Sequence, residues 1–123
     1  MSLSFNIIEN KNCVIAEVLS DKLIINYVQD ALDLMAECDY LGARKIIINK
    51  ENIIPEFFDL KTGIAGEILQ KFSTYGVRLA IIGNFSGGMS SSLRDFIYES
   101  NKGGIINFLE KRDEAIAKLS VER

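Results

Sequence analysis

D-L-K-T-G-I-A-G-E-I-L-Q-K-F-S-T-Y-G, residues 59–76, predicts an amphipathic helix whose apolar side chains recur every fourth residue. Asp59 is placed to accept backbone N–H groups as the N-cap, and Gly76 can end the helix in the left-handed conformation. The predicted helix start holds Asp59, Lys61 and Thr62 at the positive end of a helix dipole, where anions are stabilised. The expected apolar stripe consists of Leu60, Ile64, Ile68 and Phe72, with Ala65 and Leu69 beside it.

Two short β-rich runs lie near the start of the chain, at residues 5–9 and 13–19. They are separated by Asn10-Lys11-Asn12, residue types that favour a tight turn between strands. We therefore expect an antiparallel hairpin whose first strand lies at an edge of the sheet.

The next segment predicts a helix and then a buried strand. Asn26, followed three residues later by Gln29, resembles a capping box, so we expect a helix from Asn26 to about Leu41. The run Ile46-Ile47-Ile48 is continuously apolar, without the alternation of a half-exposed strand. Such a strand has both faces covered, or it has one face covered and the other in an interface.

After residue 76 the sequence predicts two more strands and two more helices around a polar, glycine-rich loop. The helix that follows this loop can be N-capped by Ser90, Ser91 or Ser92. The expected elements are a strand at residues 77–83, the loop at 84–89, that helix, a strand at 105–109 and a terminal helix at 112–121.

The resulting order of elements, β-β-α-β-α-β-α-β-α, is typical of an α/β fold. Strands that alternate with helices through short connections pair in parallel, through right-handed crossovers. The first strand enters through a tight turn and must therefore run antiparallel. We expect a mixed, mostly parallel five-stranded sheet with four helices packed against it.

Length and composition indicate one domain across residues 1–123. The chain has 48% hydrophobic and 25% charged residues, a single proline, and no glycine- or serine-rich linker. A chain of this length buries roughly two thirds of its unfolded surface, which is enough for a core without disulfides. Because the regular pattern begins at Phe5, Met1-Ser2-Leu3 is interpreted as a leader added for expression.

The net charge and the cysteine content indicate which classes of partner and which cellular compartment to expect. A net charge of −3, with both signs interspersed, argues against a nucleic-acid partner, which would require a basic surface. No apolar run approaches the ~20 residues of a membrane-spanning helix, and the N-terminus lacks a signal-peptide pattern. Cys13 and Cys38 form no disulfide framework, which suits a reducing compartment. We therefore expect a soluble cytoplasmic protein without a membrane span.

The chain lacks the residues that several kinds of catalysis require. The chain contains no histidine, which excludes a His-ligated metal and a serine or cysteine nucleophile activated by histidine. The two cysteines lack metal-ligand or redox spacing. No catalytic residue, metal site or cofactor is predicted, and we expect a protein that is not an enzyme.

Two weaker signals leave other chemistry open. The loop G-N-F-S-G-G at residues 83–88 could cradle a phosphate, but it lacks G-x-G-x-x-G spacing and a Walker lysine, which favours an ordinary connection. Asp95 with Glu99, and Asp30 with Asp33, lie about one helical turn apart. Such pairs form a catalytic dyad or, more commonly, exposed polar faces.

Phe57-Phe58 beside Pro55 form an aromatic cluster in a predicted loop. A small core under the loop is the favoured interpretation, and a contact patch for a partner is the alternative.

In an α/β sheet, ligands and partners bind beyond the carboxyl ends of the parallel strands. That edge collects polar side chains from three connections, without an evident acid, base or nucleophile. It therefore resembles a recognition surface more than a catalytic centre. The candidate binding or regulatory residues are Asp59, Lys61, Thr62, Asn84, Ser86, Ser90, Ser91 and Ser92.

The order of elements and the segment K-T-G-I-A, residues 61–65, resemble the STAS domain of anti-sigma-factor antagonists and sulfate transporters. There the corresponding helix opens with Asp-Ser-Ser-Gly-Leu, and the second serine is phosphorylated in regulatory members. Thr62 stands at the place of that serine, Gly63 and Ile64 match the Gly-Leu, and Lys61 replaces the first serine. Leu60 replaces the aspartate, in a region that partner kinases read.

A second resemblance covers essentially the whole chain. The runs N-K-E-N-I-I-P-E-F-F-D-L-K-T-G-I-A-G-E-I-L-Q-K-F and S-L-R-D-F-I-Y-E-S-N-K-G are similar to those of an uncharacterised bacterial domain family with a STAS-like topology. That resemblance implies helices mainly on one face of the sheet, and it supplies no activity.

Three functions remain open. The leading hypothesis is a non-enzymatic regulatory or protein-binding module that acts at the strand-end edge. The alternative is a small-ligand-binding protein, its ligand unknown, or a carboxylate-dependent enzyme at the same edge. The third is self-association as a homodimer, because helices mainly on one face would leave the other face of the Ile46–Ile48 strand apolar.

Overall fold

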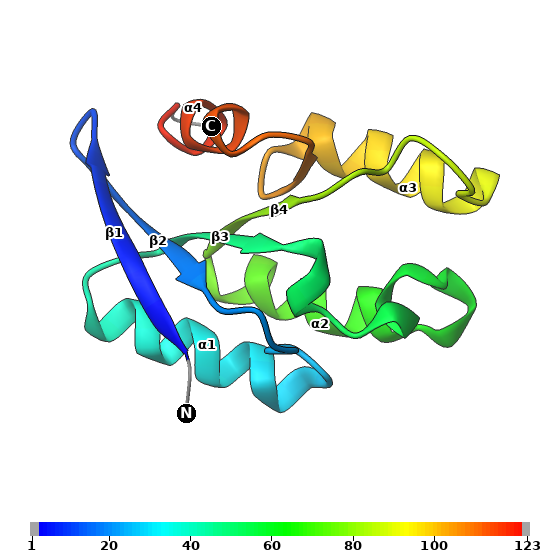
Figure 1. Cartoon of the computed structure of the whole chain (residues 1–123), viewed down its shortest axis with the longest axis horizontal. Helices are drawn as coiled ribbons and strands as arrows, with labels where there is room; N and C mark the ends of the chain where they lie inside the picture. The colour runs from blue at the N-terminus through cyan, green and yellow to red at the C-terminus, as the bar shows by residue number, and fades with distance from the viewer. Residues whose placement is uncertain (1–2, 122–123) are drawn as a thin grey trace.

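A computed structural model of the chain describes residues 3–121 and places five strands in one mixed sheet (Figure 1). The strands lie side by side in chain order; β1 pairs antiparallel with β2, and the remaining neighbours pair in parallel. The predicted sheet, including its antiparallel edge strand, is confirmed. The strands are β1 (Ser4–Asn10), β2 (Cys13–Leu19), β3 (Lys45–Asn49), β4 (Arg78–Ile82) and β5 (Ile106–Leu109).

Within residues 3–121, four α-helices connect or follow the strands, and three short 3-10 turns lie between β3 and α2. In Figure 1, α1 and α2 lie on one side of the sheet and α4 lies on the other. The apolar residues of α1 and α2 belong to the larger core cluster, and Phe96 and Ile97 of α3 pack against the same cluster. The helices are α1 (Val28–Tyr40), α2 (Ile64–Tyr75), α3 (Ser91–Gly103) and α4 (Arg112–Leu119), and the turns are η1 (Lys50–Asn52), η2 (Pro55–Phe58) and η3 (Leu60–Thr62).

Strand β3 is covered on both faces by the chain itself. Ile46 and Ile48 lie in the larger cluster. Ile47 lies in a second cluster with Ala115 and Leu119 of α4 and is 1% exposed. The first of the two alternatives for this isoleucine run is therefore correct, and the strand supplies no reason for a homodimer.

Helix α4 is held over the sheet by polar contacts at both of its ends. At its start, Arg112 Nε lies 2.6 Å from Glu17 Oε2 on β2. Burial disfavours the Glu17 carboxylate, but hydrogen bonds from Arg112 and Asn6, with the attraction of Arg112, outweigh it and lower the Glu17 pKa. At its end, the Arg78 guanidinium donates to the carbonyl oxygens of Lys118 and Val121, at 3.2 and 2.6 Å.

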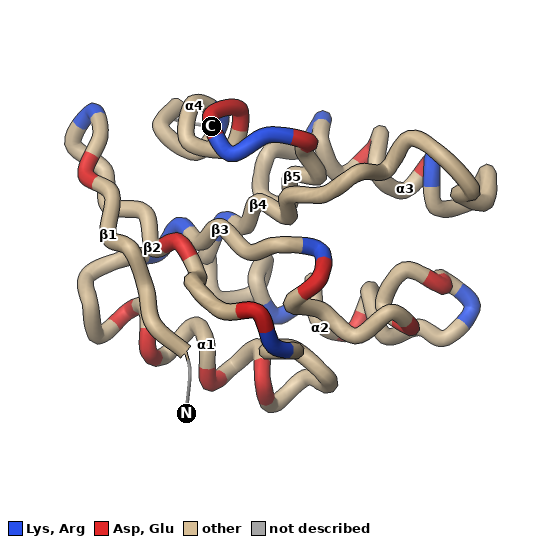
Figure 2. The backbone as a smooth tube through the Cα atoms, viewed as in Figure 1, with Lys and Arg blue, Asp and Glu red and all other residues tan. Residues whose placement is uncertain are grey.

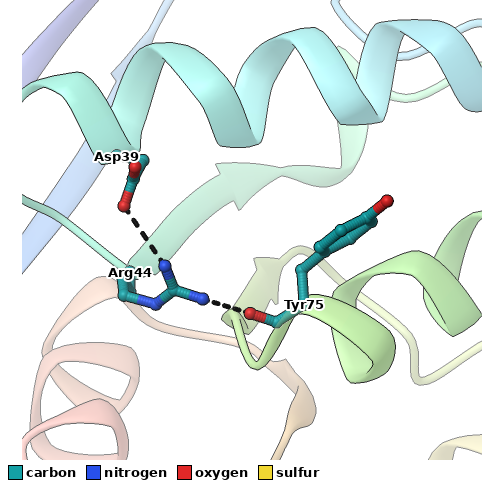
Figure 3. A network of polar contacts seen from close by, with 3 residues as sticks. All are labelled: Asp39, Arg44 and Tyr75. Carbon is teal, nitrogen blue, oxygen red and sulfur yellow. Dashed lines mark hydrogen bonds and ion pairs between the residues drawn. The ribbon is translucent and has the colours of Figure 1, made fainter.

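Arg44, just before the start of β3, joins α1 to the end of α2 (Figure 3). Arg44 Nη1 donates to Asp39 Oδ1 of α1 at 3.2 Å, and Nη2 donates to the carbonyl oxygen of Tyr75 at the end of α2. The two helices are thus joined at the edge opposite the carboxyl ends of β3 and β4. A cavity of about 220 Å³ lies there, lined partly by Met35 and Val77.

Two predicted helix starts are wrong. Helix α1 begins at Val28 with Tyr27 as its N-cap and no side-chain cap, and the Asn26 N–H donates instead to Asp30 Oδ2 at 2.8 Å. The helix expected from Asp59 begins at Ile64, because Gly63 adopts a left-handed conformation, with φ of 77°, and separates it from η3. A run of apolar residues at helical spacing cannot reveal such a break in the backbone.

The leader interpretation falls mostly outside the described residues, since residues 1–2 are not among them. Leu3 is described, and it packs against the larger core cluster.

Candidate interaction site at the carboxyl ends of the strands

The connections that leave β3 and β4 meet at one edge of the sheet, on the right in Figure 1. Residues 50–63 form the turns η1, η2 and η3 after β3, and residues 83–90 connect β4 to α3. The loop of residues 20–27, which follows β2, reaches the same edge through a parallel bridge between Ile25 and Ile53. This is the edge where open α/β sheets bind their ligands.

Asp59 and Thr62 organise the turn η3. Asp59 Oδ1 accepts the Lys61 N–H at 3.3 Å and so caps η3, not α2. The Thr62 hydroxyl donates toward the carbonyl oxygens of Asp59 and Glu56, at 2.8 and 3.0 Å. Its oxygen also accepts the Ile64 N–H at 3.2 Å. Thr62 therefore lies before α2, not in its first turn, yet it contacts the first N–H group of that helix.

The loop after β4 is folded on itself by Asn84. Asn84 Oδ1 accepts the N–H and the hydroxyl of Ser86, at 2.9 and 2.6 Å. The Asn84 carbonyl oxygen accepts a hydrogen bond from Lys50 Nζ at 3.1 Å. A Cβ on Gly83 would lie 2.6 Å from Lys50 Cβ, so only glycine allows the exits of β3 and β4 to come this close.

Aromatic rings connect these two loops beneath the surface. The ring centroids of Phe58 and Phe85 are 6.1 Å apart, and those of Phe85 and Phe108 are 5.5 Å apart. Lys50 Nζ lies 5.7 and 5.3 Å from the centroids of Phe58 and Phe85, which adds a cation–π contribution. Phe57 is 1% exposed and belongs to the larger core cluster, not to the separate small core under the loop that the sequence favoured, whereas Phe58 is half-buried at the surface.

The three serines before α3 act differently from one another. Ser90 Oγ accepts the Leu93 N–H at 3.1 Å and is the N-cap of α3, one of the three positions that the sequence allowed. Ser91 and Ser92 are the first exposed residues of the helix. The loop that contains Asn84 and Ser86 contacts the η2–η3 region through the rings of Phe85 and Phe58. The Ser90 hydroxyl, in contrast, accepts a hydrogen bond from its own helix.

Asn52 is the organising residue that the sequence did not reveal. It is 1% exposed, and its Nδ2 donates to the carbonyl oxygens of Ser20 and Lys22, both at 2.9 Å. Its Oδ1 accepts the Asn49 N–H at 3.1 Å. These bonds join the β2 exit to the β3 exit. An asparagine between Glu51 and Ile53 gives no sign of the bonds to Ser20 and Lys22, because these residues lie 32 and 30 positions away along the chain.

A hollow of about 420 Å³ lies between these connections, and its walls are mainly apolar. Leu23 is 49% exposed on its rim and gives the hollow an accessible apolar side. Of the predicted candidates none lines it, although Lys61 and Thr62 follow closely after Phe58. We call this feature the strand-end hollow; its lining residues are Leu23, Lys50, Glu51, Ile53, Pro55 and Phe58.

The carboxylate pairs considered as dyads have ordinary neighbours. Asp30 accepts hydrogen bonds from Asn26, and Asp33 accepts one from Gln29 at 2.9 Å. Glu99 forms an exposed ion pair with Lys102 at 3.7 Å. These contacts fit the interpretation of exposed polar faces.

Other reactive groups are also constrained. Burial, together with the nearby Glu37 carboxylate, raises the pKa of the Cys38 thiol to about 12, so it stays protonated at neutral pH. Within residues 3–121 no group of three or more His, Cys, Asp or Glu side chains is arranged to hold a metal ion. In the same part of the chain, every helix is too short or too polar to cross a bilayer.

A protein-family model described as "Domain of unknown function (DUF4180)" matches residues 10–119. The chain belongs to the DUF4180 family. This confirms the prediction of an uncharacterised family. The comparison with curated proteins finds no match.

The fold of this DUF4180 chain is similar to a crystal structure from Thermotoga maritima whose protein is provisionally assigned as an anti-sigma factor antagonist. The TM-score is 0.51 at 14% sequence identity, and the likeness covers 97% of this chain and 95% of the other. At this identity the likeness concerns the fold alone, and the predicted STAS-like fold is confirmed.

Proposed function

We propose that this DUF4180 chain is a non-enzymatic regulatory module that binds another protein through the strand-end hollow and the turn η3. The observation that carries the proposal is the hollow itself, with apolar walls and Phe58 half-buried in it. A patch of this kind, rimmed by Lys50, Glu51 and the polar turn, suits a protein partner. The similar protein is described as an antagonist of an anti-sigma factor, which is itself a protein.

Thr62 supplies a means of regulation in this proposal. Its side chain is exposed, and its hydroxyl closes η3 against the start of α2. A phosphate on Thr62 would replace the hydroxyl proton that reaches the Asp59 carbonyl oxygen and would add about −1.5 to −2 charge. We expect that change to open η3 and to alter the rim of the strand-end hollow.

A small ligand is the second candidate for the same place. A volume of about 420 Å³ lies within the range of roughly 300–1,000 Å³ that is usual for small-molecule pockets. The hollow is open to one side and lacks convergent polar groups on its apolar walls, so a protein side chain suits it better.

The proposal also places the protein in the cytoplasm, where the free Cys13 and Cys38 thiols would stay reduced. Self-association as a homodimer at the same surface is the alternative proposal, supported by the exposed apolar side chain of Leu23 on the rim of the hollow. A homodimer through the hollow would compete with the partner.

The test is capture of partners from the native host with the full chain, followed by titration of the purified partner. Phe58→Ala should weaken binding about tenfold or more, because anchors in apolar pockets dominate interface energies. Tyr40→Ala is the matched control, since Tyr40 is 91% exposed on α1 and does not line the hollow. Equal binding by both variants would reject this site. Thr62→Glu and Thr62→Val, with intact-mass analysis of host-purified protein, test the switch separately.

A further inference from the structure

A second groove runs beside α1, on the other side of Leu23 from the strand-end hollow. It has a volume of about 280 Å³. Its apolar lining includes Leu3, Ile24 and Leu34, and α1 contributes the carboxylates of Asp30, Asp33 and Glu37. We call it the α1 groove. It combines an apolar lining with acidic side chains from a single helix.

Helix α1 concentrates the negative charge of the molecule. Its sequence, V-Q-D-A-L-D-L-M-A-E-C-D-Y, contains four carboxylates and no lysine or arginine, whereas the net charge of the whole chain is −3. Figure 2 shows the acidic positions along α1 with no basic position between them. Asp39, at the far end, is paired with Arg44. Asp30 and Asp33 accept hydrogen bonds from the uncharged Asn26 and Gln29, which leave their charges in place.

The two grooves share one lining residue. Leu23 lines both the strand-end hollow and the α1 groove. It is 49% exposed and belongs to the loop that Asn52 holds at this edge through Lys22. Any extended or helical segment that leaves the hollow across Leu23 therefore reaches the carboxylates of α1.

We propose that the α1 groove receives a basic segment of the partner protein, in which lysine or arginine residues flank a large apolar side chain. The apolar side chain contacts Leu23 and Ile24, and the basic residues face Asp33 and Glu37. Charge complementarity of this kind raises the association rate and sets specificity. This inference rests on the proposed function, because it names the chemistry of the partner that the hollow binds.

The test uses a fluorescent synthetic peptide of lysine and leucine at helical spacing, with a glutamate–leucine peptide of the same pattern as the negative probe. Neutralising the groove with Asp33→Asn and Glu37→Gln should weaken the lysine–leucine peptide about tenfold. The matched control, Glu67→Gln with Asp95→Asn, removes the same charge from exposed positions on α2 and α3, and should change affinity less than about twofold. Leu23→Ser should also weaken the peptide, and backbone amide shifts should centre on Leu23 and α1.

Three outcomes would overturn the inference. They are equal losses in the two double variants, amide shifts centred away from α1, and no preference of the wild-type chain for the basic over the acidic peptide. The captured partner separates this inference from the proposed function. If Phe58→Ala weakens that partner while the Asp33→Asn, Glu37→Gln variant binds it like wild type, the function stands and the α1 groove is not its basic-segment site.

Discussion

The two connections at the strand-end edge are built in different ways, although both follow parallel strands and contact each other. The connection after β3, residues 50–63, is anchored in the interior by Phe57 and Asn52, each 1% exposed. The connection after β4, residues 83–90, is held mainly by its own polar contacts; its links outward include the ring of Phe85, the Lys50 bond to Asn84 and the Gly83 N–H bond to Leu109. We infer that the first connection is a rigid platform and that the second adapts to it.

The largest effect is expected from removing the interior anchor of the first connection. Phe57→Ala should lower the free energy of unfolding by about 3–5 kcal/mol, because a fully buried ring leaves a cavity in a close-packed core. Phe85→Ala, in the second connection, should cost clearly less, since Phe85 is only half-buried. Chemical denaturation of both variants measures the difference. Equal losses would remove the distinction between platform and adaptable loop.

Asn52→Ala should have the next largest effect, roughly 2–4 kcal/mol, because a buried side chain would be removed and two carbonyl oxygens and one N–H, in partly buried bonds, would lose their partner. Asn84→Ala is the matched control, and its exposed local bonds should be worth about 1 kcal/mol or less. Hydrogen exchange should also rise at Ile24 and Ile25, whose N–H groups donate to the Asn52 carbonyl oxygen. Unchanged protection there would mean that the β2 exit is held by other contacts.

The contact between the two connections is tested at Gly83. Gly83→Ala places a Cβ 2.6 Å from Lys50 Cβ, and such overpacking typically costs about 1–3 kcal/mol. Gly87→Ala is the control within the same loop, because its Cβ would meet nothing within 4 Å and its φ is not positive. Denaturation midpoints should separate the two variants. If both behave like wild type, the exits of β3 and β4 are free to move apart.

The same contrast explains what could be predicted from the sequence. The order of elements and the parallel pairing follow from apolar runs such as Ile46–Ile48. Such a run can be recognised as a buried strand from consecutive residues alone. A serine cap at residues 90–92 follows from the position of these serines before an amphipathic helix, but the sequence does not decide which of the three is the cap. The turn η3 could not be predicted, because the stripe through Leu60 and Ile64 continues across the left-handed Gly63.

The sequence predicts the edge of the sheet at which the candidate site lies, but it predicts only some of the residues that shape this edge. Asp59, Thr62, Asn84 and Ser86 do shape the connections at the edge, through short-range bonds. The lining of the strand-end hollow depends on Leu23, which reaches it from a distant loop through long-range backbone bonds near Asn52. Contacts of that kind leave no periodic or spacing signal in the chain.

The smallest difference concerns the two caps at this edge. Ser90 caps a helix of 13 residues, whereas Asp59 caps a 3-10 turn of three residues through a longer contact of 3.3 Å. We expect Ser90→Ala to cost about 1 kcal/mol and Asp59→Ala about 0.5 kcal/mol, the lower end for capping residues. Ser91→Ala, next to the first cap and without its bond to Leu93, is the control. The same denaturation series measures all three. A larger loss of unfolding free energy for Asp59→Ala than for Ser90→Ala would mean that η3 supports α2 directly. The turn that carries Thr62 would then belong to the rigid platform and not to a switch.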